Sequence, residues 1–162
     1  LSKLESLHAP AQRQRLSLRT LVSAQLEAMA GTLAQRRLQA RWLDASDAAV
    51  DGDASQLTLA ISNLLANAAD FAPDGSTLDL AVQRVGDDAV FTLRDHGPGV
   101  PDYAWPRLGE RFFSTPRPRD GARGTGLGLA IVRQVAALHG GRLVFEAADP
   151  GLRAQLHLPA AA

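Results

Sequence analysis

The fold of this chain is decided by three short stretches, Asn63-Leu64-Leu65-Ala66-Asn67-Ala68, Asp95-His96-Gly97-Pro98-Gly99 and Gly124-Thr125-Gly126-Leu127-Gly128-Leu129. The first lies inside a helical pattern of apolar residues. The second follows a segment that alternates like a strand, and the third leads directly into another helical pattern. One polar helix and two glycine-rich loops are therefore the features that the rest of the chain has to bring together.

Size and composition limit the possible functions. A chain of 162 residues that is 46% hydrophobic is large enough to bury one core, so a single compact domain is expected. The formal net charge is zero, which argues against non-specific binding of nucleic acid or of an anionic membrane surface. The chain has no cysteine, which excludes disulfides and thiolate metal sites.

Periodicity and turn residues predict the elements. A helix over residues 53–71 begins at Asp53, with Gln56 placed as in a capping box. The other expected helices cover 21–36, 105–112 and 127–139, and the expected strands cover 16–18, 38–43, 77–85, 89–94, 142–147 and 152–158. These elements predict an α+β fold of two layers, with three helices covering one face of a mixed, mostly antiparallel sheet.

The helix over residues 53–71 carries two asparagines on one side. Its apolar stripe faces the sheet, whereas another face carries Gln56, Asn63, Asn67 and Asp70. Asparagine is a poor residue for a helix interior, so two of them four positions apart need a reason. One reading is a solvated polar face. The other is that an amide oxygen binds Mg²⁺, which prefers oxygen ligands and keeps several waters.

The two glycine loops fit contact with a nucleotide. A carboxylate at a strand end, as at Asp95, can accept a hydrogen bond from an exocyclic amine such as that of adenine, although a tight turn is the alternative. Glycines at the start of a helix leave backbone amides for phosphates, although a hinge is the alternative. The loop at Gly124 lacks the Lys-Ser/Thr of a Walker loop and does not follow a strand as a Rossmann loop does.

In this order the segments closely resemble the ATP-binding catalytic domain of sensor histidine kinases, within the gyrase, chaperone, histidine kinase and MutL superfamily. The resemblance covers residues 16–158. Residues 56–71 resemble the N box, 95–99 the G1 box, 110–113 the F box and 124–129 the G2 box. The resemblance implies the Bergerat-type ATP-binding fold.

The resemblance also implies roles for individual residues. Asn67 would bind Mg²⁺ with Asn63 beside it, and Asp95 would bind the adenine amine. Residues 114–123 would form a lid over ATP. The implied nucleotide-binding residues are Asn63, Asn67, Phe71, Asp95, Gly97, Gly99, Val100, Phe112, Gly124, Thr125, Gly126, Leu127 and Gly128.

Two features depart from the family pattern. Asp70 stands where many of these kinases carry a basic residue, so another cation has to approach the phosphates. Arg111 is the first candidate, with a role in catalysis, and Arg123 is the second, whereas Arg117 and Arg119 are expected only to keep the lid soluble. In addition, none of the four histidines, His8, His96, His139 and His157, has the setting of a phosphoacceptor.

The implied function is transfer of the γ-phosphoryl group of Mg-ATP to a histidine on an upstream dimerisation helix outside this chain, for relay to a response regulator. Residues 1–12 would be the end of that helix with a linker, and 13–162 the ATP-binding domain. The resemblance implies a homodimeric parent in the inner membrane, with this domain in the cytoplasm and without direct contact to membrane or nucleic acid. The alternatives are a degenerate nucleotide-binding or dimerisation module, an anti-sigma serine kinase and a superfamily ATPase.

Overall fold

The computed structural model describes residues 7–10, 12–118, 121, 124 and 126–162. The helices are α1 (Leu18–Ala28), α2 (Ala30–Arg36), α3 (Ala54–Phe71) and α4 (Gly128–Leu138), with a 3₁₀ helix, η1 (Asp102–Arg107). The strands are β1 (Gln14–Ser17), β2 (Gln39–Trp42), β3 (Ala49–Gly52), β4 (Thr77–Val85), β5 (Asp88–Arg94), β6 (Arg142–Ala147) and β7 (Leu152–Pro159). Among the described helices, none combines the length and the apolar character needed to cross a bilayer.

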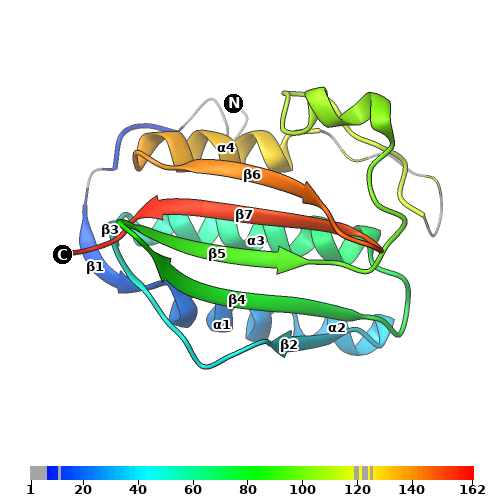
Figure 1. Cartoon of the computed structure of the whole chain (residues 1–162), viewed down its shortest axis with the longest axis horizontal. Coiled ribbons are helices and arrows are strands. Elements are labelled where there is room, and N and C mark those ends of the chain that lie inside the picture. The colour runs from blue at the N-terminus through cyan, green and yellow to red at the C-terminus, as the bar shows by residue number, and fades with distance from the viewer. Residues whose placement is uncertain (1–6, 11, 119–120, 122–123, 125) are drawn as a thin grey trace.

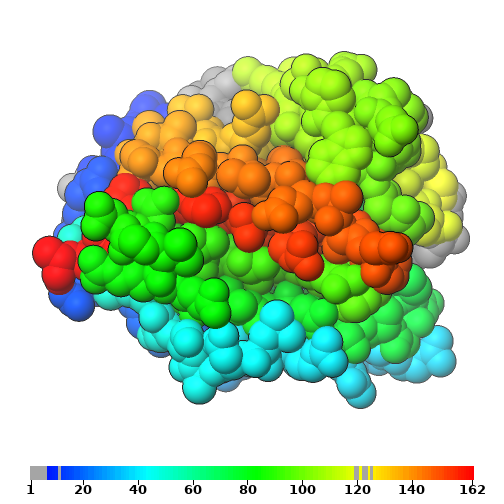
Figure 2. Space-filling view, viewed as in Figure 1, coloured from blue at the N-terminus to red at the C-terminus, as the bar shows by residue number. Residues whose placement is uncertain are grey.

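The strands form a five-stranded sheet in the order β2-β4-β5-β7-β6 and a separate β1-β3 pair. Only the β2-β4 pairing of the five-stranded sheet is parallel. The helices lie behind one face of the sheet, and Figure 1 shows α3 behind its middle, with α1 and α4 on either side. On the opposite face, Figure 2 shows the side chains of the strands lying side by side. The predicted two-layer α+β fold is confirmed.

The apolar stripe of α3 fixes the distance between the two layers. Leu57, Ile61 and Leu65 are fully buried, and Leu64 and Ala68 are nearly so. They pack in one core with Leu156 and Leu158 of β7 and Val132 of α4. Burial of a leucine or isoleucine side chain stabilises a fold by about 1.5–3 kcal/mol, so this stripe is a major source of stability.

The predicted helix over residues 21–36 is wrong in two respects. It begins earlier, at Leu18, because the Ser17 side chain accepts a hydrogen bond from the backbone N–H of Thr20 and caps the helix. It also breaks at Met29, where the backbone leaves the helical region before α2 begins. The strand predicted over residues 16–18 is instead β1, which ends at Ser17.

Two further predictions differ from the structure. The short helix expected over residues 105–112 is η1, which ends at Arg107. Pro106 lacks the N–H that a longer helix needs, and Gly109 has a φ of +82° that no helix contains. The strand β3 was not predicted, because its four residues owe their extended form to pairing with β1.

The start of α3 is tied to the end of α4 through His139. Asp53 accepts a hydrogen bond from the backbone N–H of Gln56, as the capping box predicts. The return bond differs, because the Gln56 side chain donates to the His8 carbonyl, and the Asp53 N–H donates to His139 Nε2 at 3.1 Å. His139 Nδ1 donates to the Val135 carbonyl at 2.8 Å, so the buried ring is bound as the neutral tautomer.

The free-energy cost of removing the His139 link should depend on pH. Burial lowers the pKa of His139 below its ordinary value of 6.5. A lowered pKa means that the stabilisation is complete above pH 6.5 and is lost as pH falls through the pKa of the folded state. His139→Ala should therefore cost about 1–3 kcal/mol at pH 8 and distinctly less at pH 5, measured by urea unfolding. An equal cost at both pH values would contradict this role.

Candidate functional site

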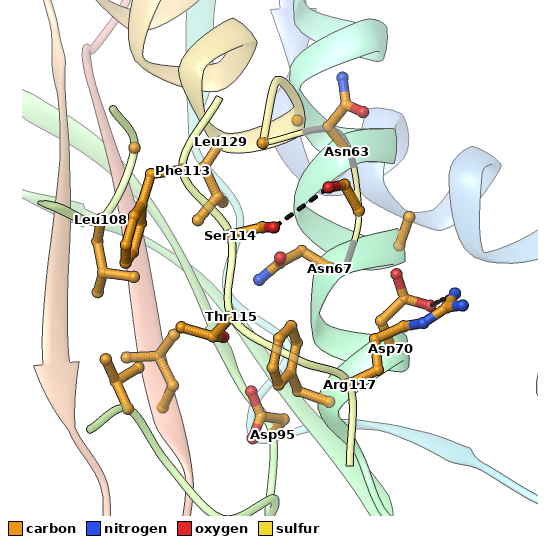
Figure 3. A pocket seen from close by; sticks show the side chains of 18 of the residues that line it. Asn63, Asn67, Asp70, Asp95, Leu108, Phe113, Ser114, Thr115, Arg117 and Leu129 are labelled. Carbon is orange, nitrogen blue, oxygen red and sulfur yellow. Dashed lines mark hydrogen bonds and ion pairs between the residues drawn. The ribbon is translucent and has the colours of Figure 1, made fainter. Parts of the chain in front are cut away.

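The three stretches that decide the fold meet at one end of the sheet. They enclose a cavity of about 210 Å³ together with the segment over residues 108–117. Figure 3 shows the side chains of Asn67, Ser114 and Asp95 around it. The lining residues are Asn63, Ala66, Asn67, Asp70, Phe71, Asp95, Gly99, Val100, Leu108, Gly109, Phe113, Ser114, Thr115, Arg117, Gly124, Gly126, Gly128, Leu129 and Leu152.

The asparagines of α3 present amide oxygens to this cavity. Asn63 Nδ2 donates to the Leu59 carbonyl one turn earlier, at 3.0 Å, and this bond turns its Oδ1 toward the loop at Gly128. Asn67 is half-buried, and among the described residues none forms a hydrogen bond with its side chain. Asn67 therefore offers one neutral oxygen, which suits a magnesium ion held otherwise by phosphates and water.

Asp95 is a buried carboxylate at the base of the cavity. It is 3% exposed, and its Oδ1 accepts a hydrogen bond from the Gly97 N–H at 2.9 Å. Burial raises the pKa of Asp95, although the hydrogen bond from Gly97 acts in the opposite direction. A carboxylate that has lost water in this way is stabilised by a further donor, and an exocyclic amine of a base supplies one.

Gly97 was predicted to contact the nucleotide, but it does not line the cavity. Its backbone N–H instead binds the carboxylate of Asp95. A Cβ at Gly97 would lie 2.2 Å from the Phe71 carbonyl oxygen, so only glycine lets the loop approach the end of α3. Phe71 itself lines the cavity, as do Gly99 and Val100. The close approach of this loop to α3 sets the depth at which Asp95 lies.

Gly126 joins the second glycine loop to the F-box segment. Its carbonyl accepts a hydrogen bond from the Phe112 N–H at 2.9 Å, and its φ is +75°. A Cβ at Gly126 would lie 2.3 Å from the Phe112 carbonyl carbon. Ser114 Oγ donates to the Gly124 carbonyl at 3.2 Å. This bond and the one from Phe112 to Gly126 join the F-box segment to the second glycine loop.

The sequence predicted that Phe112 of the F box contacts the nucleotide. In the structure it is Phe113 that lines the cavity. Phe112 has a φ of +67° and is 67% exposed. In this left-handed conformation, with its N–H bound to Gly126, Phe112 projects outward and its neighbour turns inward. A positive φ at a phenylalanine is rare, so sequence pattern does not signal this exchange.

The other predicted residues of the G2 box lie at the start of α4. Gly128 is its first residue and lines the cavity, so the N-terminal end of α4 faces that space. Leu127 precedes it as the N-cap and is not among the lining residues. The prediction for Thr125 falls outside the described residues.

The arginines considered as phosphate ligands lie in positions that the sequence did not predict. Arg111 is exposed outside the cavity, with its guanidinium carbon 5.1 Å from the centre of the Phe112 ring. Arg117 instead lines the cavity and pairs with Asp70, with 3.8 Å between its Nη1 and the Asp70 Oδ1. The predictions for Arg119 and Arg123 fall outside the described residues.

Comparison with known proteins agrees with this geometry. Residues 52–162 match the family model described as histidine kinase-, DNA gyrase B-, and HSP90-like ATPase. The matched segment holds α3, both glycine loops and every residue that lines the cavity. The chain belongs to this ATPase family.

Similar proteins place it among the sensor histidine kinases. The sensor protein QseC of Salmonella typhimurium is 35% identical over 156 residues, which are 95% of this chain and 33% of that protein. The mycobacterial sensor histidine kinase MprB has a structure with 30% identity and a TM-score of 0.78, covering 92% of this chain and 98% of that one. The ATP-binding domain of PrrB from Mycobacterium tuberculosis is 25% identical, with a TM-score of 0.73 and coverages of 93% and 98%.

These comparisons identify the domain and its class. The chain has the fold and sequence of the catalytic ATP-binding domain of sensor histidine kinases. It spans about a third of the length of QseC.

Asp95→Asn should weaken nucleotide binding without lowering the stability of the fold. Because the pKa of Asp95 is raised, the stabilisation from its protonated carboxyl is complete below its ordinary pKa of 3.8 and is lost as pH rises through the higher pKa of the folded state. At neutral pH the amide removes a buried charge and still offers Oδ1 to Gly97. The variant should melt at the same or a higher temperature, bind Mg-ATP more weakly and lose preference for ATP over GTP in calorimetry. Normal binding by the variant would contradict the adenine assignment.

Proposed function

We propose that this domain binds Mg-ATP and transfers its γ-phosphoryl group to a histidine on a dimerisation helix outside this chain, for relay to a response regulator. The observation that carries the proposal is the single cavity onto which Asn67, Asp95 and the glycine loop at the start of α4 all open. These groups suit the metal, the base and the phosphates of one nucleotide. The parent is proposed to be a homodimeric sensor of the inner membrane, with this domain in the cytoplasm.

The magnesium ion would be held by Asn67 together with the phosphates. Among the described residues, no group of three or more His, Cys, Asp or Glu side chains could hold a metal by itself. One amide oxygen is therefore the expected protein contribution, and the ion when bound neutralises phosphate charge. The chain's own task is to hold the nucleotide in one position, which is most of what catalysis of phosphoryl transfer requires.

The acceptor has to come from elsewhere, because none of the four histidines lines the cavity. His96 Nε2 lies 3.0 Å from Asp79 Oδ2, and Asp79 also pairs with Arg41 at 2.8 Å. His139 is buried and holds the start of α3. Water is not an efficient substitute acceptor, since the Asn63 amide cannot take a proton as a general base.

A second candidate function is a nucleotide-binding module that does not transfer phosphate. Its support is Asp70, an acidic residue that lines the cavity beside Asn67. Phosphotransfer decides between the two functions.

The isolated domain should show no autophosphorylation with radiolabelled ATP. It should transfer label when the dimerisation helix of its parent protein is supplied, and the label should be acid-labile, as expected for phosphohistidine. Asn67→Ala should abolish magnesium-dependent binding and transfer. Acid-labile label on the isolated domain would show that one of its own histidines is the acceptor, whereas binding without any transfer would favour the binding module.

Arg111 is proposed to contact the phosphoryl group during transfer. It is exposed, so an incoming acceptor helix could bring it to the reacting group, where arginine can hold phosphate oxygens in a bidentate fork. Arg111→Ala should reduce the transfer rate by about 10- to 100-fold and change the Kd for Mg-ATP less than threefold. Arg142→Ala is a matched control, because Arg142 is exposed on β6, pairs with Asp88 and does not line the cavity. Unchanged transfer in Arg111→Ala would rule out this role.

A further inference from the structure

The charged side chains that line the cavity include more carboxylates than cations, which does not favour binding of a triphosphate. Among the described lining residues, the charged ones are Asp70, Asp95 and Arg117. Asp95 lies at the base, where the adenine is proposed to bind. Asp70 follows Asn67 by three positions on α3, which places a carboxylate on the side of the helix that offers the metal ligand. This carboxylate would repel phosphates unless a cation accompanies it.

Among the described residues, Arg36 and Arg117 lie near Asp70, and Arg36 is held by bonds to other groups. Arg36 borders a second cavity together with Asp70, but its guanidinium donates to the carbonyls of Ala69 and Ala72 and to Asp74 Oδ1, each at 2.6 Å. These bonds hold the C-terminal end of α3. Among the described residues, Arg117 pairs with Asp70 and also lines the cavity.

Arg117 reaches Asp70 from a segment on the opposite side of the cavity. Figure 3 shows its side chain extending from that segment to α3, where the ion pair with Asp70 is drawn. The base of the segment is closed by the bond from Ser114 to Gly124. The separation of 3.8 Å and the partial exposure of both side chains make the pair weak. A phosphate group with more negative charge can therefore share or take the guanidinium.

We propose that Asp70 is a positioning residue that holds Arg117 at the phosphate end of the cavity, so that Arg117 supplies the cation for the β- and γ-phosphates of the nucleotide. This inference rests on the proposed function, because it assumes that the cavity binds a nucleoside triphosphate. The cation comes from the segment over the cavity, and α3 supplies the carboxylate that orients it. Arg117 acts in nucleotide binding, which is distinct from the proposed role of Arg111 in transfer.

The decisive test is the sign of the effect of Asp70→Asn in two backgrounds. Loss of a negative charge beside a polyanion should by itself tighten binding. If Asp70 positions Arg117, Asp70→Asn in the wild type should instead weaken Mg-ATP binding about three- to tenfold. In the Arg117→Ala background, where the Arg117 guanidinium is absent, the same substitution should tighten it. This reversal is a coupling that a merely structural role would not produce.

Removing the Arg117 guanidinium, and returning one at position 70, tests independently whether the phosphates need a cation there. Arg117→Ala should weaken Mg-ATP binding about tenfold or more in calorimetry and leave adenosine binding, followed by NMR titration, within twofold. The double variant Asp70→Arg/Arg117→Ala should recover most of the loss, because it returns a guanidinium to the site. Arg84→Ala is the matched control, since Arg84 is an exposed arginine of β4 outside the cavity.

The outcomes separate this inference from the proposed function. Tighter Mg-ATP binding by Asp70→Asn in both backgrounds would show that Asp70 only opposes phosphate and would overturn the inference. Unchanged Mg-ATP binding by Arg117→Ala, or an equal loss of adenosine binding, would also overturn it while leaving the proposed function intact. Failure of the wild-type domain to bind Mg-ATP would instead overturn the proposed function and this inference with it.

Discussion

Burial of the apolar stripe of α3 against the sheet is the constraint on which the site depends. Leu57, Ile61 and Leu65 are inaccessible to solvent, so the helix has one possible rotation about its axis. That rotation turns Asn63, Asn67 and Asp70 toward the cavity. The helix is also fixed along its length, by His139 at its start and by Arg36 at its end. A polar site on a helix keeps its geometry only when rotation and translation are both restrained.

The first glycine loop reaches this helix, and the second reaches the F-box segment, through backbone contacts that require glycine. Gly97 meets the Phe71 carbonyl, and Gly126 meets the backbone of Phe112, at distances that exclude a Cβ. A strand end, a helix end and a loop thereby become neighbours, although they are far apart in the sequence. The two glycines act by permitting close approach, which is a different role from direct contact with phosphate. Asp95 and Phe113 then enter the cavity from backbones that these contacts hold in place.

The sequence predicted those parts of the fold whose local pattern matches their tertiary environment. The stripe of α3, its cap at Asp53 and the β4-β5 hairpin agree with the structure, as does the lining role of Asn67, Asp95 and Gly126. The strand β3 escaped prediction because it depends on pairing with β1, which is distant in sequence. The break at Met29 escaped prediction because Met29 is neither glycine nor proline, the residues that usually mark the end of a helix. The inward turn of Phe113 depends on a positive φ at its neighbour. The pairing of Asp70 with Arg117 joins residues 47 positions apart, which no local pattern encodes.

The proposed role of the Asp70–Arg117 pair would explain how an acidic residue can stand beside the phosphates. A basic residue on the helix would contribute a permanent charge there, whether or not a nucleotide is present. A carboxylate on the helix with an arginine on the segment across the cavity is neutral as a pair. Under the proposal, the guanidinium would turn to the phosphates when a nucleotide binds, and the segment that carries it would be linked to that step. Phosphate binding and the position of that segment would then be coupled, and by linkage each would influence the other equally.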